Sequence, residues 1–280
     1  MSPASERNAG DGGPGAGAGQ VDAALAARAR LERLLAAPTP FRADTGEADP
    51  AVTAVLESTD RPRHEYLDAV WRAVMASRVI VPVIAHAPPG AHAVRLGASD
   101  AVPSMPRVRG REVRPDDAAR DATALALSLP DGHVGLPVFT SAAAMAAWRS
   151  DVRPVPVEPV RAARVACAAT DQLWVLDPGT HDLRLPRPAV LALAEGESWV
   201  PSWRNGPVQA EVAAQLGEVP GVTGVAFAPG EEAELRVFVR IASGGGMPAV
   251  AAALEACQHI MVDPAWGDFI DTVELCPLPA

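Results

Sequence analysis

Apolar side chains recur along this chain at two spacings, one helical and one extended. From His64 to Ser77 they fall three and four residues apart, which gathers them on one face of a helix. The next segment, 79–84, is apolar throughout and rich in β-branched residues, which predicts a strand buried on both faces. Over 235–241 apolar residues alternate with arginine and phenylalanine, which predicts a strand with one buried and one more polar face.

The same two spacings, with the turn residues between them, predict the other elements. Further helices are expected over 21–37, 141–148, 158–168, 188–194, 208–216 and 248–258. Further strands are expected over 123–129, 135–139, 173–176, 183–185, 222–227 and 272–276, with one short strand between 258 and 272. Residues 86–120 are rich in proline, glycine and charge, which favours irregular structure or a loose hairpin.

Local composition divides the chain into a tail and two domains. Residues 1–20 are rich in glycine, alanine and serine and cannot bury enough apolar surface to offset the entropy of ordering, so a disordered tail is expected. Residues 201–207 are polar and interrupted by proline and glycine, which indicates a domain boundary. The expected fold class is α/β (mixed α+β), with domains at 21–204 and 205–280, each a mixed sheet with packed helices.

The charge balance excludes several function classes. The formal net charge is -10, which disfavours nucleic acid as a partner because the phosphate backbone is repelled. All 24 basic residues are arginine, and the chain contains no lysine. Schiff-base enzymes, pyridoxal-phosphate enzymes, Walker-A nucleotide sites and protein kinases all need a lysine and are therefore excluded.

The cysteines and the apolar runs indicate a compartment. Cys167, Cys257 and Cys276 are odd in number and far apart, which favours free thiols in a reducing environment. The N-terminus has no apolar signal core, and no apolar run is long enough to span a bilayer. A cytoplasmic protein without a membrane partner is expected.

Thr140 and Ser141 stand at an expected strand-to-helix junction. Backbone amides at a helix start attract anions, so these residues are candidate ligand contacts. The simpler interpretation is a helix cap, in which a side-chain oxygen satisfies those amides. The Gly-x-Ser-x-Gly pattern of a nucleophile elbow is missing around Ser141, so a hydrolase that pairs this serine with a distant histidine is a remote alternative.

Tryptophans mark two other candidate surfaces. Trp199 and Trp203 flank the expected boundary, where they either contact a partner or seal the two domains together. Asp263, Asp268 and Asp271 surround a further tryptophan, an arrangement that suits a cation or a partner but lacks the spacing of a calcium loop.

No other group of residues predicts a reactive centre. His86 and His92 flank a Pro-Pro-Gly turn, and Cys257 lies close to His259 and Asp263, but neither set has a zinc-site spacing. Cys257 also shares a helix face with apolar residues, as a small core residue does. The sequence therefore predicts no catalytic, cofactor-binding or metal-ligating residues, and no cofactor.

The run Leu-Pro-Val-Phe-Thr-Ser at 136–141, followed by an Ala-rich helix, resembles the hallmark segment of SseB-type proteins, the enhanced serine sensitivity family. Residues 66–82 resemble the upstream helix and strand of that family, and 152–161 and 173–177 resemble its downstream segments. Residues 207–276 resemble its smaller C-terminal domain. The resemblance implies two α/β-type domains, a cytoplasmic location and an undefined molecular role, with no agreed catalytic residues.

Three functions follow as hypotheses. The first is a non-enzymatic, protein-binding or regulatory role with an unknown protein partner, because the patterning describes a scaffold without a reactive centre. The second is a small-molecule sensor for an amino acid or an anion, bound near Thr140 or between the domains. The third, remote, is the hydrolase that uses Ser141.

Overall fold

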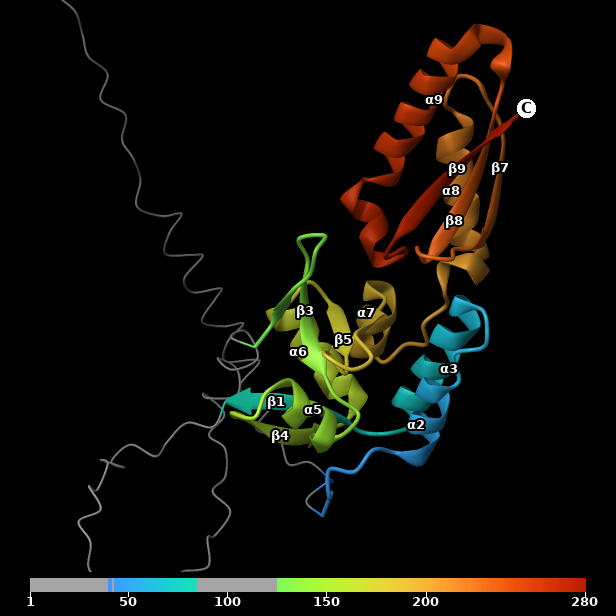
Figure 1. The fold of residues 1–280 in the computed structure, drawn as a ribbon. Coiled ribbons are helices and arrows are strands. Elements are labelled where there is room, and N and C mark those ends of the chain that lie inside the picture. Colours follow the sequence, from blue (N-terminus) through green and yellow to red (C-terminus); the bar gives the residue numbers. More distant parts are fainter. Residues whose placement is uncertain (1–39, 42, 85–124) are drawn as a thin grey trace, which may run out of the picture.

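The computed structural model describes residues 40–41, 43–84 and 125–280. They form two units, each with its own sheet and apolar core (Figure 1). We call residues 43–84 and 125–200 the N-terminal unit and residues 201–280 the C-terminal unit. The expected tail at 1–20, the helix at 21–37 and the irregular segment at 86–120 lie outside the described residues.

The N-terminal unit contains a mixed sheet and an antiparallel strand pair. The four-stranded sheet has the order β2 (Leu127–Ser128), β3 (Val134–Val138), β5 (Leu173–Leu176), β6 (Leu183–Leu185). Within it β3 and β5 are parallel, and the outer strands are antiparallel to them. The second sheet pairs β1 (Val79–Ile84) with β4 (Val152–Val157). Backbone hydrogen bonds of 2.8 Å between Ile80 and Phe139 join this pair to the end of β3.

Helices cover these sheets and complete the core of the N-terminal unit. Two of them, α2 (Pro50–Glu57) and α3 (Arg63–Met75), precede β1. The others are α5 (Ala142–Trp148), α6 (Pro159–Ala169) and α7 (Arg187–Glu195). The core is built around Trp174, which is fully buried, together with Trp71 from α3 and alanines from α6. Within the described residues, no helix combines the length and the apolarity needed to cross a bilayer.

The strand β4 was not expected from the sequence, because Pro154 and Pro156 lie inside it. Proline lacks an amide hydrogen and so removes a hydrogen bond between paired strands. The sequence of this segment therefore does not predict a strand. Here β4 pairs only with β1, and half of its backbone groups face no partner strand. Proline is tolerated in an edge strand of this kind.

The C-terminal unit is a three-stranded sheet with two helices on one face. The strands β7 (Val222–Pro229), β8 (Leu235–Ile241) and β9 (Val273–Pro279) lie in that order, and β9 runs parallel to β8. Alternate residues of β8 are buried against α8 (Gly206–Gly217) and α9 (Gly246–Met261), which confirms the predicted two-faced strand. The opposite face of β8 carries the partly exposed side chains of Arg236 and Phe238.

Short 3-10 helices complete the chain: η1 (Ser202–Arg204), η2 (Ser243–Gly245) and η3 (Pro264–Asp268). The prediction of a short strand between 258 and 272 is wrong, since α9 continues to Met261 and η3 follows it. The expected strand at 123–129 is reduced to Leu127–Ser128 within the described part. The mixed α/β fold is confirmed, while the division at 204/205 stays a prediction.

Candidate functional site

Thr140 and Ser141 lie where β3 ends and α5 begins, next to the end of the parallel strand β5. The Ser141 hydroxyl accepts a hydrogen bond of 3.0 Å from the Ala144 amide, so Ser141 is the helix cap. The Ala142 amide donates to the Gly46 carbonyl at 2.8 Å. Because the chain itself satisfies these amides, the start of α5 offers an incoming anion few free donors.

The Asp177 carboxyl group holds Thr140 in place. Its two oxygens accept bonds from the Thr140 amide, at 2.8 Å, and from the Thr140 hydroxyl, at 2.7 Å. Asp177 is 1% exposed, and burial raises the pKa of its carboxyl group above the ordinary value although the bonds from Thr140 lower it. The ends of the two parallel strands are therefore tied to each other.

Gly46 supports this junction through its backbone conformation and its small size. Its φ is +81°, and a Cβ atom there would lie 2.7 Å from the Ala142 side chain. Gly46→Ala is therefore expected to lower the free energy of unfolding by about 2–3 kcal/mol, from backbone strain and overpacking. Gly132→Ala is the control, since Gly132 has φ of +86° but no atom within 4 Å of a Cβ. Equal losses in urea unfolding would show that the contact with Ala142 contributes nothing.

The tryptophans at the boundary connect the two cores. Trp199 packs against the N-terminal core, where its ring centroid is 5.7 Å from that of Trp71. Trp203 packs against the C-terminal core. The two rings meet edge to face at 5.9 Å, the geometry that aromatic pairs prefer. Both rings are thus engaged within the molecule, and a contact with an external partner stays a prediction.

A buried carboxylate ties the start of the C-terminal unit to the backbone of Asp271. Glu234 is 3% exposed and accepts hydrogen bonds from the Ser202 amide, at 3.1 Å, and from the Asp271 amide, at 2.7 Å. Burial raises the pKa of its carboxyl group, although these bonds act in the opposite direction. Glu234 therefore fixes the backbone of Asp271 at the junction of the units.

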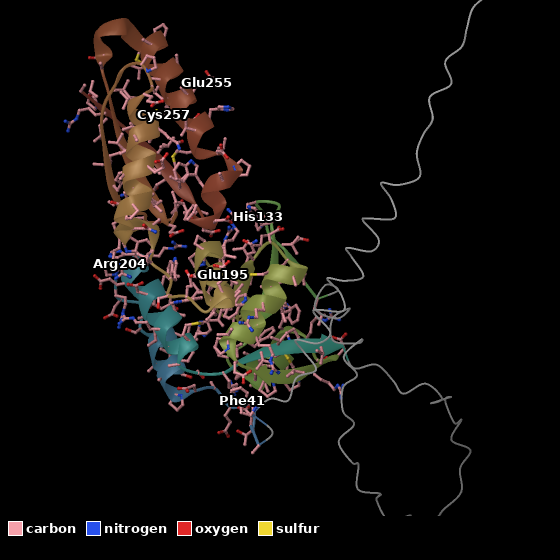
Figure 2. All side chains as sticks on the ribbon, turned by 180° about the vertical axis from the view of Figure 1, so that it is seen from behind. Phe41, His133, Glu195, Arg204, Glu255 and Cys257 are labelled. Atoms are coloured by element: carbon pink, nitrogen blue, oxygen red, sulfur yellow. The ribbon has the colours of Figure 1, made fainter. Side chains whose placement is uncertain are left out.

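The Asp271 side chain crosses from the C-terminal to the N-terminal unit. It is 4% exposed and accepts two bonds of 3.1 Å from Arg184 and one of 3.0 Å from the Arg187 Nε atom. Arg184 also pairs with Asp131 in the β2–β3 turn. Figure 2 shows His133 of this turn and Arg204 on opposite sides of the junction, where Arg204 pairs with Asp68.

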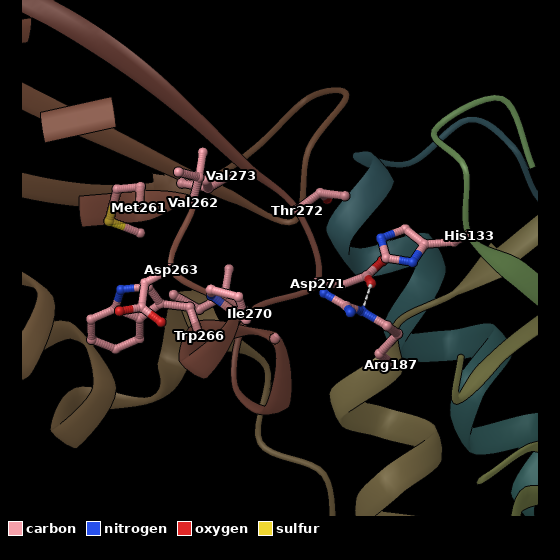
Figure 3. Close-up of a pocket in the computed structure, with 12 residues that line it drawn as sticks. His133, Arg187, Met261, Val262, Asp263, Trp266, Ile270, Asp271, Thr272 and Val273 are labelled. Carbon is pink, nitrogen blue, oxygen red and sulfur yellow. Dashed lines mark hydrogen bonds and ion pairs between the residues drawn. The ribbon is translucent and has the colours of Figure 1, made fainter. Parts of the chain in front are cut away.

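A cavity of about 320 Å³ opens beside the Arg187–Asp271 pair (Figure 3). The N-terminal unit contributes His133 and Arg187, and the C-terminal unit contributes the segment from 261 to 273. Among these residues, Met261 and Ile270 are buried and give the cavity an apolar wall. The volume lies at the lower end of the range of ligand pockets, which often occur between domains.

Most of the Asp cluster noted in the sequence lies at this cavity. Asp263, Trp266 and Asp271 line it, whereas Asp268 does not. The Trp266 indole donates to the Ile260 carbonyl at 3.1 Å, which fixes the ring. The Asp271 carboxylate accepts its side-chain hydrogen bonds from Arg184 and Arg187. Arg187 was not singled out from the sequence, although its place at the first position of α7 was a signal, since a cation is disfavoured at a helix start.

The other candidates form no assembled reactive group in the described residues. Ser141 makes no hydrogen bond to a histidine within the described ranges, and His86 and His92 lie outside them. No cluster of three potential metal ligands occurs in the described part. Cys257 is buried in the C-terminal core, and all three cysteines are free thiols.

Comparison with known proteins identifies the family of the chain. The family model described as SseB protein N-terminal domain matches residues 52–192, half of the chain. No curated protein and no solved structure matches significantly. The matched segment runs from α2 into α7 and contains β3, the start of α5 and Asp177. The chain therefore belongs to the SseB family.

Proposed function

We propose that this SseB-family chain is a non-enzymatic regulatory protein that binds a small molecule in the junction cavity. The observation that carries the proposal is that the two units line one cavity together. A ligand seated there contacts both units at once and thereby biases how they are held together. Of the two locations expected for a sensor site, the space between the domains has this cavity, whereas the helix start at Thr140 is occupied by the chain's own groups.

The non-enzymatic part of the proposal is supported by how the buried acids are used. Asp177 and Glu234 have raised pKa values, which is a frequent property of catalytic carboxyl groups. Both, however, direct their oxygens at backbone amides and at the Thr140 hydroxyl, and neither lines the junction cavity. Their role in this geometry is to hold the chain.

A thermal-shift screen with a panel of metabolites tests the proposal. A ligand that binds only the native state at about 100 times its Kd adds roughly 2.7 kcal/mol of stability. For a chain of this size that corresponds to a rise in Tm of about 5 °C or more.

The variant Val262→Trp and its control Met247→Trp locate the site of any such ligand. Val262 lines the cavity and is 72% exposed. An indole side chain at this position therefore narrows the cavity without disturbing the core. Met247, 78% exposed at the start of α9, lies away from it. The shift is expected to vanish in Val262→Trp and to persist in Met247→Trp. A panel without any saturable shift would contradict the proposal.

A protein partner is the second candidate, supported by the face of the C-terminal sheet that no described helix covers. Phe238 and Cys276 are paired across β8 and β9 on that face and are partly exposed, and Leu278 farther along β9 is 40% exposed. Partner capture from native lysate is expected to retain a reproducible protein with the natural chain and to lose it with Leu278→Glu. If the Leu278→Glu variant retains the same protein as the natural chain, this face of the sheet is not the binding surface.

We also propose a cytoplasmic location, supported by the three free thiols, which suit a reducing compartment. Cell fractionation with an antibody to the chain tests it. The C-terminal unit is proposed to be the smaller C-terminal SseB-type domain, in keeping with the resemblance of residues 207–276.

A further inference from the structure

The guanidinium group of Arg187 is only partly used by the protein. Its Nε atom donates to Asp271, whereas its Nη1 and Nη2 atoms donate no hydrogen bond to any described residue. By contrast, Arg184 uses Nε and Nη2 on Asp271 and Nη1 on Asp131. Among the described residues, the two Nη atoms of Arg187 are therefore donors without a partner, and Arg187 lines the cavity.

The position of this free edge is fixed by its neighbours. The bond to Asp271 holds the Nε side of the guanidinium group, and the Gly267 backbone packs over its face, where a Cβ atom would lie 3.0–3.3 Å from Nη2, Nη1 and Cζ. A planar fork held in this way is preorganised for a carboxylate, which accepts two parallel N–H bonds.

The rest of the cavity suits an apolar body with a single negative charge. Met261, Ile270 and the fixed ring of Trp266 supply apolar and aromatic surface. Asp263 and Asp271 also line the cavity, so a dianion such as phosphate meets two carboxylates there. The described groups in the lining that can carry a positive charge are Arg187 and His133, the latter 3.5 Å from Asp171. A volume of about 320 Å³ corresponds to roughly ten water molecules, enough for a small aromatic or branched aliphatic acid.

We propose that the junction cavity binds a small organic monocarboxylate with an apolar body, whose carboxylate bonds to the Nη1 and Nη2 atoms of Arg187. This inference rests on the proposed binding function of the same cavity and adds the chemical class of the ligand. The ligand would then bridge the two units, with its carboxylate on Arg187 of the N-terminal unit and its apolar body against Met261 and Ile270 of the C-terminal unit.

Titration calorimetry with full-length protein tests the class through four probes. Benzoate carries the carboxylate on an apolar ring, benzamide is its neutral analogue, benzylamine its cationic analogue, and inorganic phosphate an anion without the ring. Benzoate is expected to bind at least about tenfold more tightly than each of the other three. Benzamide and benzylamine cannot make a charge-assisted pair of bonds to the arginine, and phosphate has no apolar ring to bury. Equal or tighter binding of any other probe overturns the proposal.

Substitutions assign the site. Arg187→Lys keeps a cation beside Asp271 but loses the two-donor fork, so benzoate affinity is expected to fall about tenfold. Arg164→Lys on α6 is the matched control, since that arginine donates to the Ala194 carbonyl outside the cavity, and it is expected to leave affinity unchanged. Should Arg187→Lys fail to fold, Val262→Trp serves instead, because it blocks the cavity from an exposed position. Unchanged affinity in the variant used overturns the assignment.

Two further comparisons separate the possible failures. The C-terminus of a peptide is also a monocarboxylate beside an apolar side chain. An acetylated tetrapeptide that ends in leucine is therefore compared with benzoate. Tighter binding of the peptide would overturn the proposal that the ligand is a free small molecule. If benzoate fails while another metabolite gives a shift that Val262→Trp abolishes, the ligand class is wrong and the binding function stands. If neither binds, both proposals fail.

Discussion

Asp271→Asn is expected to lower the free energy of unfolding by about 3 kcal/mol and to loosen the C-terminal unit from the N-terminal one. The substitution keeps the volume but removes the buried anion that two arginines share. Breaking a buried pair by removing one partner costs about 3–5 kcal/mol. The lower end of this range applies here. The side chains of Arg184 and Arg187 are 25% and 21% exposed, so water can partly hydrate them once the Asp271 charge is removed.

Urea unfolding followed by tryptophan fluorescence and by circular dichroism measures this effect. In the natural chain the two probes are expected to give coincident transitions, and in the variant the transitions should separate as the units uncouple. Asp131→Asn is the matched control: Asp131 also pairs with Arg184, but it is 41% exposed. Exposed pairs contribute about 0–1 kcal/mol, so this variant should stay close to the natural chain. Equal losses in the two variants would refute the role given to Asp271.

Local elements of this fold were largely predictable from the sequence. The strand at 79–84 and the helices around 64–77 and 158–168 match the structure to within one or two residues, because period and turn residues are properties of short segments. The failures have physical causes. The strand β4 was missed because it contains Pro154 and Pro156. A strand tolerates proline at the edge of a sheet, and only the tertiary structure shows that β4 is such a strand.

The candidate site was predictable only in part. The cluster of Asp263, Asp268, Asp271 and Trp266 stood out in the sequence, and all of these except Asp268 line the cavity. Its cationic counterpart, Arg187, lies 84 residues from Asp271, and no local spacing reports such a pairing. A binding site between two units depends on how the units dock, which residue patterns within each unit do not determine.

Asp177→Ala is expected to lower the free energy of unfolding by about 4 kcal/mol, whereas Asp177→Asn should be nearly neutral at neutral pH. Alanine leaves the buried Thr140 amide and hydroxyl without an acceptor, at a cost of about 1–3 kcal/mol for each group. It also places a Cβ-bearing residue without a polar side chain at φ of +47°, a region that asparagine and aspartate tolerate better. The asparagine amide keeps an acceptor for the Thr140 amide and a donor for the hydroxyl oxygen.

The pH dependence of these variants gives a second test with a defined sign. Burial raises the pKa of Asp177 above its ordinary value of 3.8, so the native state holds this proton to higher pH than the unfolded state does. The resulting stability is complete below the ordinary pKa and is lost as pH rises through the raised one. Asp177→Asn has no such proton, so its stability relative to the natural chain should increase as the pH rises from about 4 through the raised pKa of Asp177.

Urea unfolding at a series of pH values measures that difference directly. Glu234 also has a raised pKa and contributes the same sign of pH dependence. It is present in both proteins, so its contribution cancels when the two unfolding free energies are subtracted. A difference that stays constant with pH would mean that Asp177 is no harder to ionise in the folded chain than in the unfolded one. The tie between β3 and β5 would then be an ordinary solvated contact, contrary to the burial of Asp177.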